Sequence, residues 1–93
     1  MYPRLLKRLR DLILNRQYVV TLHGYDEMAA DDLTVWDVES AFLTGEIVEK
    51  QKDAETSELK YRVRGNSLSG TRVEIVAKIA VTGKLVVITV YAL

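Results

Sequence analysis

The sequence has little of the chemistry that many small enzymes use, because its 93 residues include no cysteine and only one histidine, His23. Without cysteine the chain has no disulfide, no thiolate nucleophile and no cysteine-based zinc site. One histidine is too few for an ordinary zinc site. We therefore expect no metal and no cofactor, and we expect a reducing, cytoplasmic environment.

Long apolar runs and nucleotide-binding motifs are also missing. The longest apolar stretch, Leu85 to Leu93, contains Thr89 and is too short to span a bilayer as a helix. Charges interrupt the apolar residues near the N-terminus, so no signal-peptide core is present. No glycine-rich phosphate loop and no dinucleotide fingerprint occur. We predict one domain over residues 1–93 and no membrane partner.

The net charge is zero, but the charges are segregated along the chain. Residues 1–16 and 59–93 are basic in net charge, whereas residues 17–58 are strongly acidic. Segregation of this kind lets a neutral protein present a basic face to a polyanion such as RNA. The alternative is that surface charges cluster without any function.

Apolar spacing and helix signals predict three helices in the first half of the chain. They run from Pro3 to about Arg16, from His23 to about Ala30, and from the N-cap Thr34 to Gly45. We expect the basic residues of the first helix to face solvent. These residues are Arg4, Lys7, Arg8 and Arg10.

Strand patterns surround and follow these helices. A short strand, Tyr18 to Leu22, is followed after the helices by four more, namely Glu46–Lys52, Leu59–Gly65, Thr71–Val81 and Leu85–Ala92. The order α-β-α-α-β-β-β-β predicts an α+β domain. We expect an antiparallel meander with the N-terminal helices packed on one face.

Alternation divides the last three strands between two faces. The predicted core face holds Tyr61, Val63, Val73, Ile75, Ala77, Ile79, Val86, Ile88 and Val90. The predicted polar face holds Lys60, Arg62, Arg64, Arg72, Glu74, Lys78, Thr89 and Tyr91.

Hairpin geometry then predicts which polar residues are neighbours. A two-residue loop at Thr82-Gly83 pairs Val81 with Lys84 and sets Glu74 opposite Tyr91. Matching faces across the other hairpin allows Arg62 to pair with Glu74. The result is a predicted row Arg62–Glu74–Tyr91 across three strands.

The polar face holds the residue types that metal-free RNA cleavage requires. His23 is a candidate general base or acid, and Tyr91 is a candidate proton donor or acceptor. Arg62, Arg64 and Lys78 are candidates for holding phosphate. Each also has a structural alternative: His23 as a helix cap or core hydrogen-bonding group, Arg62 as an ion-pair partner of Glu74, and Tyr91 as sheet packing.

The residue order resembles a prokaryotic domain-of-unknown-function family over about residues 18–92. The segments that carry the resemblance are His23-Gly-Tyr-Asp-Glu27-Met28, Leu33-Thr34-Val35-Trp36-Asp37-Val38, Gly45-Glu46-Ile47-Val48-Glu49, Tyr61-Arg62-Val63 and Val87-Ile88-Thr89-Val90-Tyr91. That family in turn resembles the RelE/MqsR-like toxins of type II toxin–antitoxin systems.

The resemblance implies a RelE-like fold and a metal-independent mRNA endoribonuclease, acting at the ribosome or away from it. Its implied partner is a cognate antitoxin of the zinc-finger or helix-turn-helix kind. The implied catalytic residues are His23 and Tyr91, with Arg62 and Lys78 on the scissile phosphate and Arg64 on the RNA backbone.

Two other functions stay open from the sequence. One is a non-enzymatic interaction module, because the strand Leu85–Leu93 is apolar on most of both faces and requires a cover. The first helix, a second copy in a homodimer or an antitoxin are the candidate covers. The other is a basic helix lying on a membrane surface.

Overall fold

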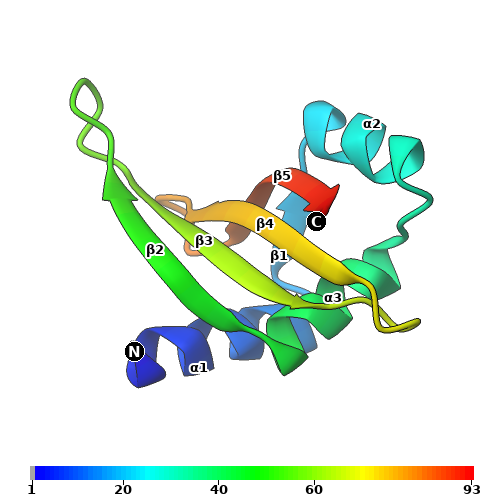
Figure 1. The fold of residues 1–93 in the computed structure, drawn as a ribbon. Coiled ribbons are helices and arrows are strands. Elements are labelled where there is room, and N and C mark those ends of the chain that lie inside the picture. Colours follow the sequence, from blue (N-terminus) through cyan, green and yellow to red (C-terminus); the bar gives the residue numbers. More distant parts are fainter. Residues whose placement is uncertain (1) are drawn as a thin grey trace.

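The computed structural model describes residues 2–93, and its elements follow the predicted order. Three helices and five strands make up the fold (Figure 1). They are α1 (Pro3–Leu14), β1 (Tyr18–Val20), α2 (Leu22–Ala30), α3 (Val35–Thr44), β2 (Glu46–Lys52), β3 (Leu59–Asn66), β4 (Arg72–Ile79) and β5 (Leu85–Ala92). The α+β class and the order α-β-α-α-β-β-β-β are therefore confirmed. No helix among residues 2–93 is long and apolar enough to cross a membrane.

The strands form one mixed sheet in the order β1-β5-β4-β3-β2. Strands β2 to β5 are an antiparallel meander, as predicted. The short strand β1 adds a parallel pair at one edge, where Tyr18–Val20 lie beside Leu85–Val87 of β5. Helices α2 and α3 carry the chain from β1 to the opposite edge of the sheet, where β2 begins (Figure 1).

Helices α1 and α3 cover one face of the sheet and form the core with it (Figure 1). From the helices, the buried side chains are Leu9, Ile13, Val38, Ala41 and Phe42. From the sheet, the buried apolar side chains are Ile47, Tyr61, Val63, Val73, Ile75, Ala77, Leu85, Val87 and Val90. Helix α2 packs along β5 and adds the buried Met28 to the same core (Figure 1).

One basic residue of α1 does not face solvent as predicted. The Arg10 side chain donates from Nε to the carbonyl of Phe42 and from Nη2 to the carbonyl of Gly45, both at 2.9 Å. These carbonyls lie at the C-terminal end of α3, where a cation is favoured by the unpaired carbonyls and the helix dipole. Arg10 therefore ties α1 to α3.

The register of the β4–β5 hairpin differs from the predicted register in two ways, and the two differences cancel. The loop has three residues, because Ala80 N–H donates to Lys84 C=O and Gly83 takes a positive φ of 88°. Val81 therefore does not pair with Lys84. A bulge then leaves Ile88 without a partner, since Val76 pairs with Thr89 and Ala77 with Val87. Beyond the bulge Glu74 faces Tyr91, as predicted.

The bulge also corrects the predicted core face of β5. Leu85 and Val87 are buried before it and Val90 after it, whereas Val86 and Ile88, both predicted in the core, are only partly buried. The extra residue of a bulge shifts the alternation of buried and exposed side chains by one position, so the pattern after the bulge is out of phase with the pattern before it.

The predicted pairing of Arg62 with Glu74 is wrong by two residues. Arg64 pairs with Glu74, and Arg62 pairs with Val76. The N–H of Ser67 donates to the carbonyl of Thr71 and closes the β3–β4 turn, so the connection is shorter than the predicted pairing requires. The row across the three strands is therefore Arg64–Glu74–Tyr91.

Candidate functional site

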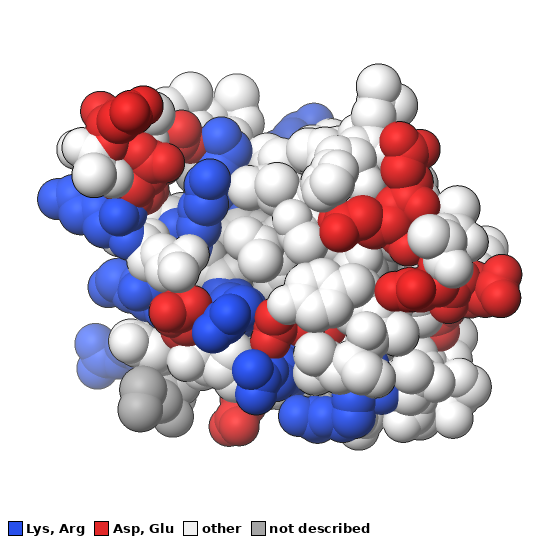
Figure 2. Space-filling model, turned by 45° about the horizontal axis from the view of Figure 1, so that its top comes forward, with Lys and Arg blue, Asp and Glu red and all other residues white. Residues whose placement is uncertain are grey.

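The face of the sheet opposite α1 and α3 is the open face, and it carries the predicted site residues of the strands. Residues that alternate with the core positions point to it from β3, β4 and β5. They include Lys60, Arg62, Arg64, Glu74, Lys78 and Tyr91. Because α1 packs on the other side, it leaves this face uncovered. In Figure 2 Lys and Arg gather at one side of this region together with a group of Asp and Glu, a second group of Asp and Glu lies on the opposite side, over α2, and mostly uncharged residues lie between them.

Local hydrogen bonds fix the start of α2 against β5 and so position His23. Thr21 caps the helix, since its Oγ1 accepts the N–H of Gly24 at 3.0 Å, and the same hydroxyl donates to the carbonyl of Ile88 at 3.2 Å. Gly24 lets the helix approach closely, because a Cβ there would lie 2.9 Å from Val20 Cγ1. His23 is the next residue after Leu22, where the helix begins.

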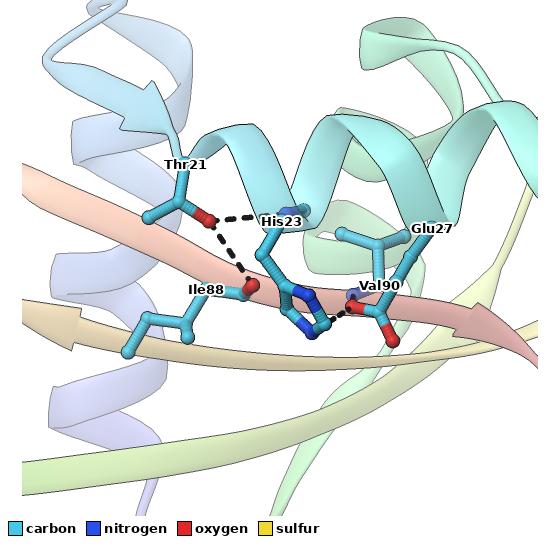
Figure 3. Close-up of polar contacts among 6 residues, drawn as sticks. Thr21, His23, Glu27, Ile88 and Val90 are labelled. Atoms are coloured by element: carbon cyan, nitrogen blue, oxygen red, sulfur yellow. Dashed lines mark hydrogen bonds and ion pairs between the residues drawn. The ribbon is translucent and has the colours of Figure 1, made fainter.

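The His23 side chain points from α2 toward β5, on the side of the sheet away from α1 (Figure 3). Its Nε2 lies 3.2 Å from Oε1 of Glu27, one helical turn later. The side chain of His23 is 67% exposed, so it is accessible from solvent. His23 is therefore neither a helix cap nor a core residue, which were its structural alternatives.

Glu27 links His23 to the strand that carries Tyr91. The same Oε1 accepts the backbone N–H of Val90 at 3.1 Å. Val90 faces the core, so Tyr91 after it faces the open side, where His23 also lies. Within residues 2–93 no hydrogen bond or ion pair joins His23 to Tyr91 directly. The connection between them runs through Glu27 and the Val90 peptide.

Arg62 and Arg64 share the carboxylate of Glu74. Arg64 Nε donates to Glu74 Oε1 at 2.6 Å, and Arg62 Nε lies 3.9 Å from the same oxygen. Arg62 Nη2 also lies 3.0 Å from Oε1 of Glu49. The Glu74 side chain is only 2% exposed, so this network lies in the floor of the open face.

Lys78 lies on β4 at the end of the open face away from Glu74, and it forms an ion pair with Glu58. Its Nζ donates to Glu58 Oε2 at 2.7 Å, and this hydrogen bond and charge hold the pKa of Glu58 below its usual value. Lys60 pairs directly with Lys78 across the strands. Glu58 therefore offsets the repulsion between two cations.

The profile of one protein family, described as a domain of unknown function (DUF4258), matches residues 20–92. The chain belongs to the DUF4258 family. The matched region begins in β1 and ends with β5, so it includes His23, Tyr91 and the whole open face of the sheet. No curated protein and no solved structure matches the chain.

Sequence reasoning missed two carboxylates that contact the site residues of this DUF4258 chain, Glu27 and Glu49, and it paired a third, Glu74, with Arg62 alone. Glu27 is four residues after His23, a spacing that places two side chains on one helix face and identifies an ion-pair partner. Glu74 is the one acidic residue between residues 59 and 93, in a strand otherwise rich in Val and Ile, which is a signal for a buried partner of arginine. Glu49 carries no such signal, because its contact with Arg62 depends on the bulge in β2.

Proposed function

We propose that this chain is a toxin-like, metal-independent endoribonuclease that cleaves mRNA and is silenced by a cognate antitoxin protein. The observation that carries the proposal is the pairing of an exposed His23 with Glu27 beside an open sheet face that holds Tyr91 and two arginines. A histidine held by a carboxylate at the rim of a cationic face suits proton transfer next to a bound phosphodiester.

The reaction needs no group beyond the side chains of this face. A general base takes the proton of the RNA 2′-hydroxyl, and the 2′-oxygen attacks phosphorus. The bond from phosphorus to the 5′-oxygen breaks, and a general acid protonates that oxygen. The products are a 2′,3′-cyclic phosphate and a 5′-hydroxyl. His23 and Tyr91 are the residues we assign to these two proton transfers, and a cation of the open face stabilises charge on phosphorus.

The experiment is RNA cleavage by purified protein in EDTA, with mapping of the product ends. We compare wild type with His23→Ala and Tyr91→Phe. Positioned acids and bases contribute about 10²–10⁴-fold, so each variant should lose activity by that factor. Tyr25→Phe and Leu22→Ala are the matched controls, since both residues are exposed on α2. Cleavage that persists in both site variants, or metal-dependent cleavage, overturns the assignment.

One observation favours a second function, a non-enzymatic interaction module. The cations Arg62 and Lys78 already have carboxylate partners, so the open face attracts RNA less than its basic residues suggest. Folded wild type that leaves RNA uncut, with ribosomes supplied, would support this function. Capture of a purified candidate antitoxin by the same protein would then test the interaction directly.

A further inference from the structure

Three cations of the open face, Arg62, Arg64 and Lys78, pair with carboxylates, and they differ in how much of their hydrogen-bonding capacity the protein itself uses. All three are partly exposed, with side-chain exposures of 37% for Arg62, 41% for Arg64 and 29% for Lys78. A cation that is saturated by carboxylates binds a phosphate only by exchanging one anion for another. The contacts of each side chain therefore decide which one binds RNA.

Arg62 lies between two carboxylates. Its Nη2 contacts Glu49 and its Nε faces Glu74, with distances of 3.0 and 3.9 Å to the respective Oε1 atoms. The Nε atom is buried and makes no hydrogen bond within residues 2–93. The guanidinium is thus directed into the sheet surface, and both of its neighbours are negative.

Arg64 uses a single atom to bind the protein. Its Nε donates to the buried Oε1 of Glu74 at 2.6 Å. Among residues 2–93 neither Nη atom of Arg64 makes a hydrogen bond or ion pair. A guanidinium has five N–H donors in a rigid plane, so fixing Nε leaves four donors with a defined orientation.

We propose that, of these three cations, Arg64 is the one that contacts a phosphodiester of single-stranded RNA, and that Glu74 is the residue that positions it. The RNA ligand rests on the proposed function, whereas the assignment to Arg64 rests on its contacts. Lys78 is tied to Glu58 at 2.7 Å and Arg62 to Glu49. These two stabilise the sheet surface instead of holding the scissile phosphate.

The strand register places Arg64 in the same cross-strand row as Tyr91, the candidate proton donor or acceptor. Arg64 pairs with Glu74, and Glu74 pairs with Tyr91, so the three side chains lie on adjacent strands in one row. Adjacent strands are about 4.8 Å apart, and the outer two are therefore separated by about 10 Å. A phosphate group bound between the side chains of Arg64 and Tyr91 fits this separation.

The test measures binding of a short 2′-O-methyl oligouridine, which has no free 2′-hydroxyl and is not cleaved. Affinity is recorded over a range of salt concentrations for wild type, Arg64→Gln, Arg62→Gln and Lys78→Gln. We expect Arg64→Gln to lose about tenfold in affinity, and the slope of log K against log salt to fall by about 0.7, the value of one phosphate contact on a single strand. Arg62→Gln and Lys78→Gln should leave the slope unchanged. Arg62→Lys, which keeps a cation opposite Glu49 and Glu74, replaces Arg62→Gln if that variant does not fold.

The positioning role of Glu74 has its own readout. In wild type the Nε–H signal of Arg64 should be slow to exchange with water in NMR spectra, because its acceptor is buried. Glu74→Ala should abolish this protection and lower single-turnover cleavage about tenfold, and Glu74→Gln, which keeps an oxygen acceptor, should restore both. A structural role alone does not produce this rescue.

The outcomes separate this inference from the proposed function. RNA cleavage with a slope that depends on Arg62 or Lys78, and not on Arg64, overturns the inference and leaves the endoribonuclease intact. Arg64-dependent binding without any cleavage supports the inference and overturns the endoribonuclease. Failure of folded wild type to bind the oligouridine overturns the inference.

Discussion

The carboxylate of Glu27 accepts the backbone N–H of Val90 at 3.1 Å, across 63 residues of sequence. Asp31 repeats the contact one turn later, accepting the N–H of Ala92 at 2.8 Å. Strand β1 pairs only with Leu85–Val87, so the rest of β5 lacks a strand on this side. Two helix carboxylates therefore satisfy donors that a sheet edge leaves open to another chain.

This arrangement predicts that the Val90 amide is protected although it lies at an edge. Glu27→Ala should speed hydrogen exchange at Val90 about tenfold or more, since a hydrogen bond to a charged acceptor contributes about 1.5–3 kcal/mol. Asp31→Ala should do the same at Ala92 and leave Val90 protected. Asp26→Ala, an exposed neighbour on α2, is the control. Equal exchange at Val90 in wild type and Glu27→Ala would show that the carboxylate does not protect it.

Close contact between α3 and β3 predicts a large effect at Gly65. A Cβ on Gly65 would lie 1.9 Å from the carbonyl oxygen of Ala41, which is backbone and cannot rotate away. Gly65→Ala should therefore destabilise the fold by about 1–3 kcal/mol or more, measured by urea unfolding. The control is Gly83→Asn, because Gly83 has open space around it and asparagine is among the side chains least disfavoured at a positive φ, here 88°. Similar losses in both variants would contradict the packing argument.

The element order was predictable because the apolar period changes clearly from helix to strand along the chain. The position of β1 was not, since three residues carry no information on whether they pair parallel or antiparallel. The pairing of Glu74 with Tyr91 was predicted correctly, although the β4–β5 loop length on which the prediction was based is wrong. The three-residue loop and the bulge at Ile88 shift the register in opposite directions, and sequence alternation detects neither.

The residue types of the candidate site were also easier to predict than their contacts. His23 and Tyr91 stand out as titratable groups beside basic strands. The different carboxylate contacts of Arg62 and Arg64 depend on the β3–β4 register, which differs by two residues from the predicted one. The carboxylates that decide it, Glu49 and Glu74, reach the arginines from other strands, so no spacing along the chain encodes these contacts.

Alkaline pH should weaken the fold through Tyr18. Burial, and then the hydrogen bond that Tyr18 donates to Glu39, raise the pKa of the phenol from 10.0 to about 12. The stabilisation is complete below pH 10 and is lost as pH rises through about 12, because ionisation breaks the bond to a carboxylate. Thermal melts over this range should show a loss that Tyr18→Phe lacks. A Tyr18→Phe variant with the same alkaline loss would assign it to other tyrosines or lysines.

Acid pH should act on Asp37, which joins α3 to the β3–β4 turn. Its carboxylate accepts the N–H of Thr34 at 2.8 Å and the N–H of Leu68 at 3.0 Å. Desolvation raises the pKa of Asp37, but these hydrogen bonds outweigh it and hold the pKa below 3.8.

The stabilisation from Asp37 is therefore present above pH 3.8 and is lost as pH falls below it. Asp37→Asn should cost about 1 kcal/mol near neutral pH, as loss of a helix N-terminal hydrogen bond does, and the difference from wild type should shrink in acid. Denaturant unfolding at several pH values measures this, with Asp26→Asn as a control that changes an exposed carboxylate on α2. A difference that stays constant down to strongly acid pH would mean that Asp37 acts through its shape and not through its charge.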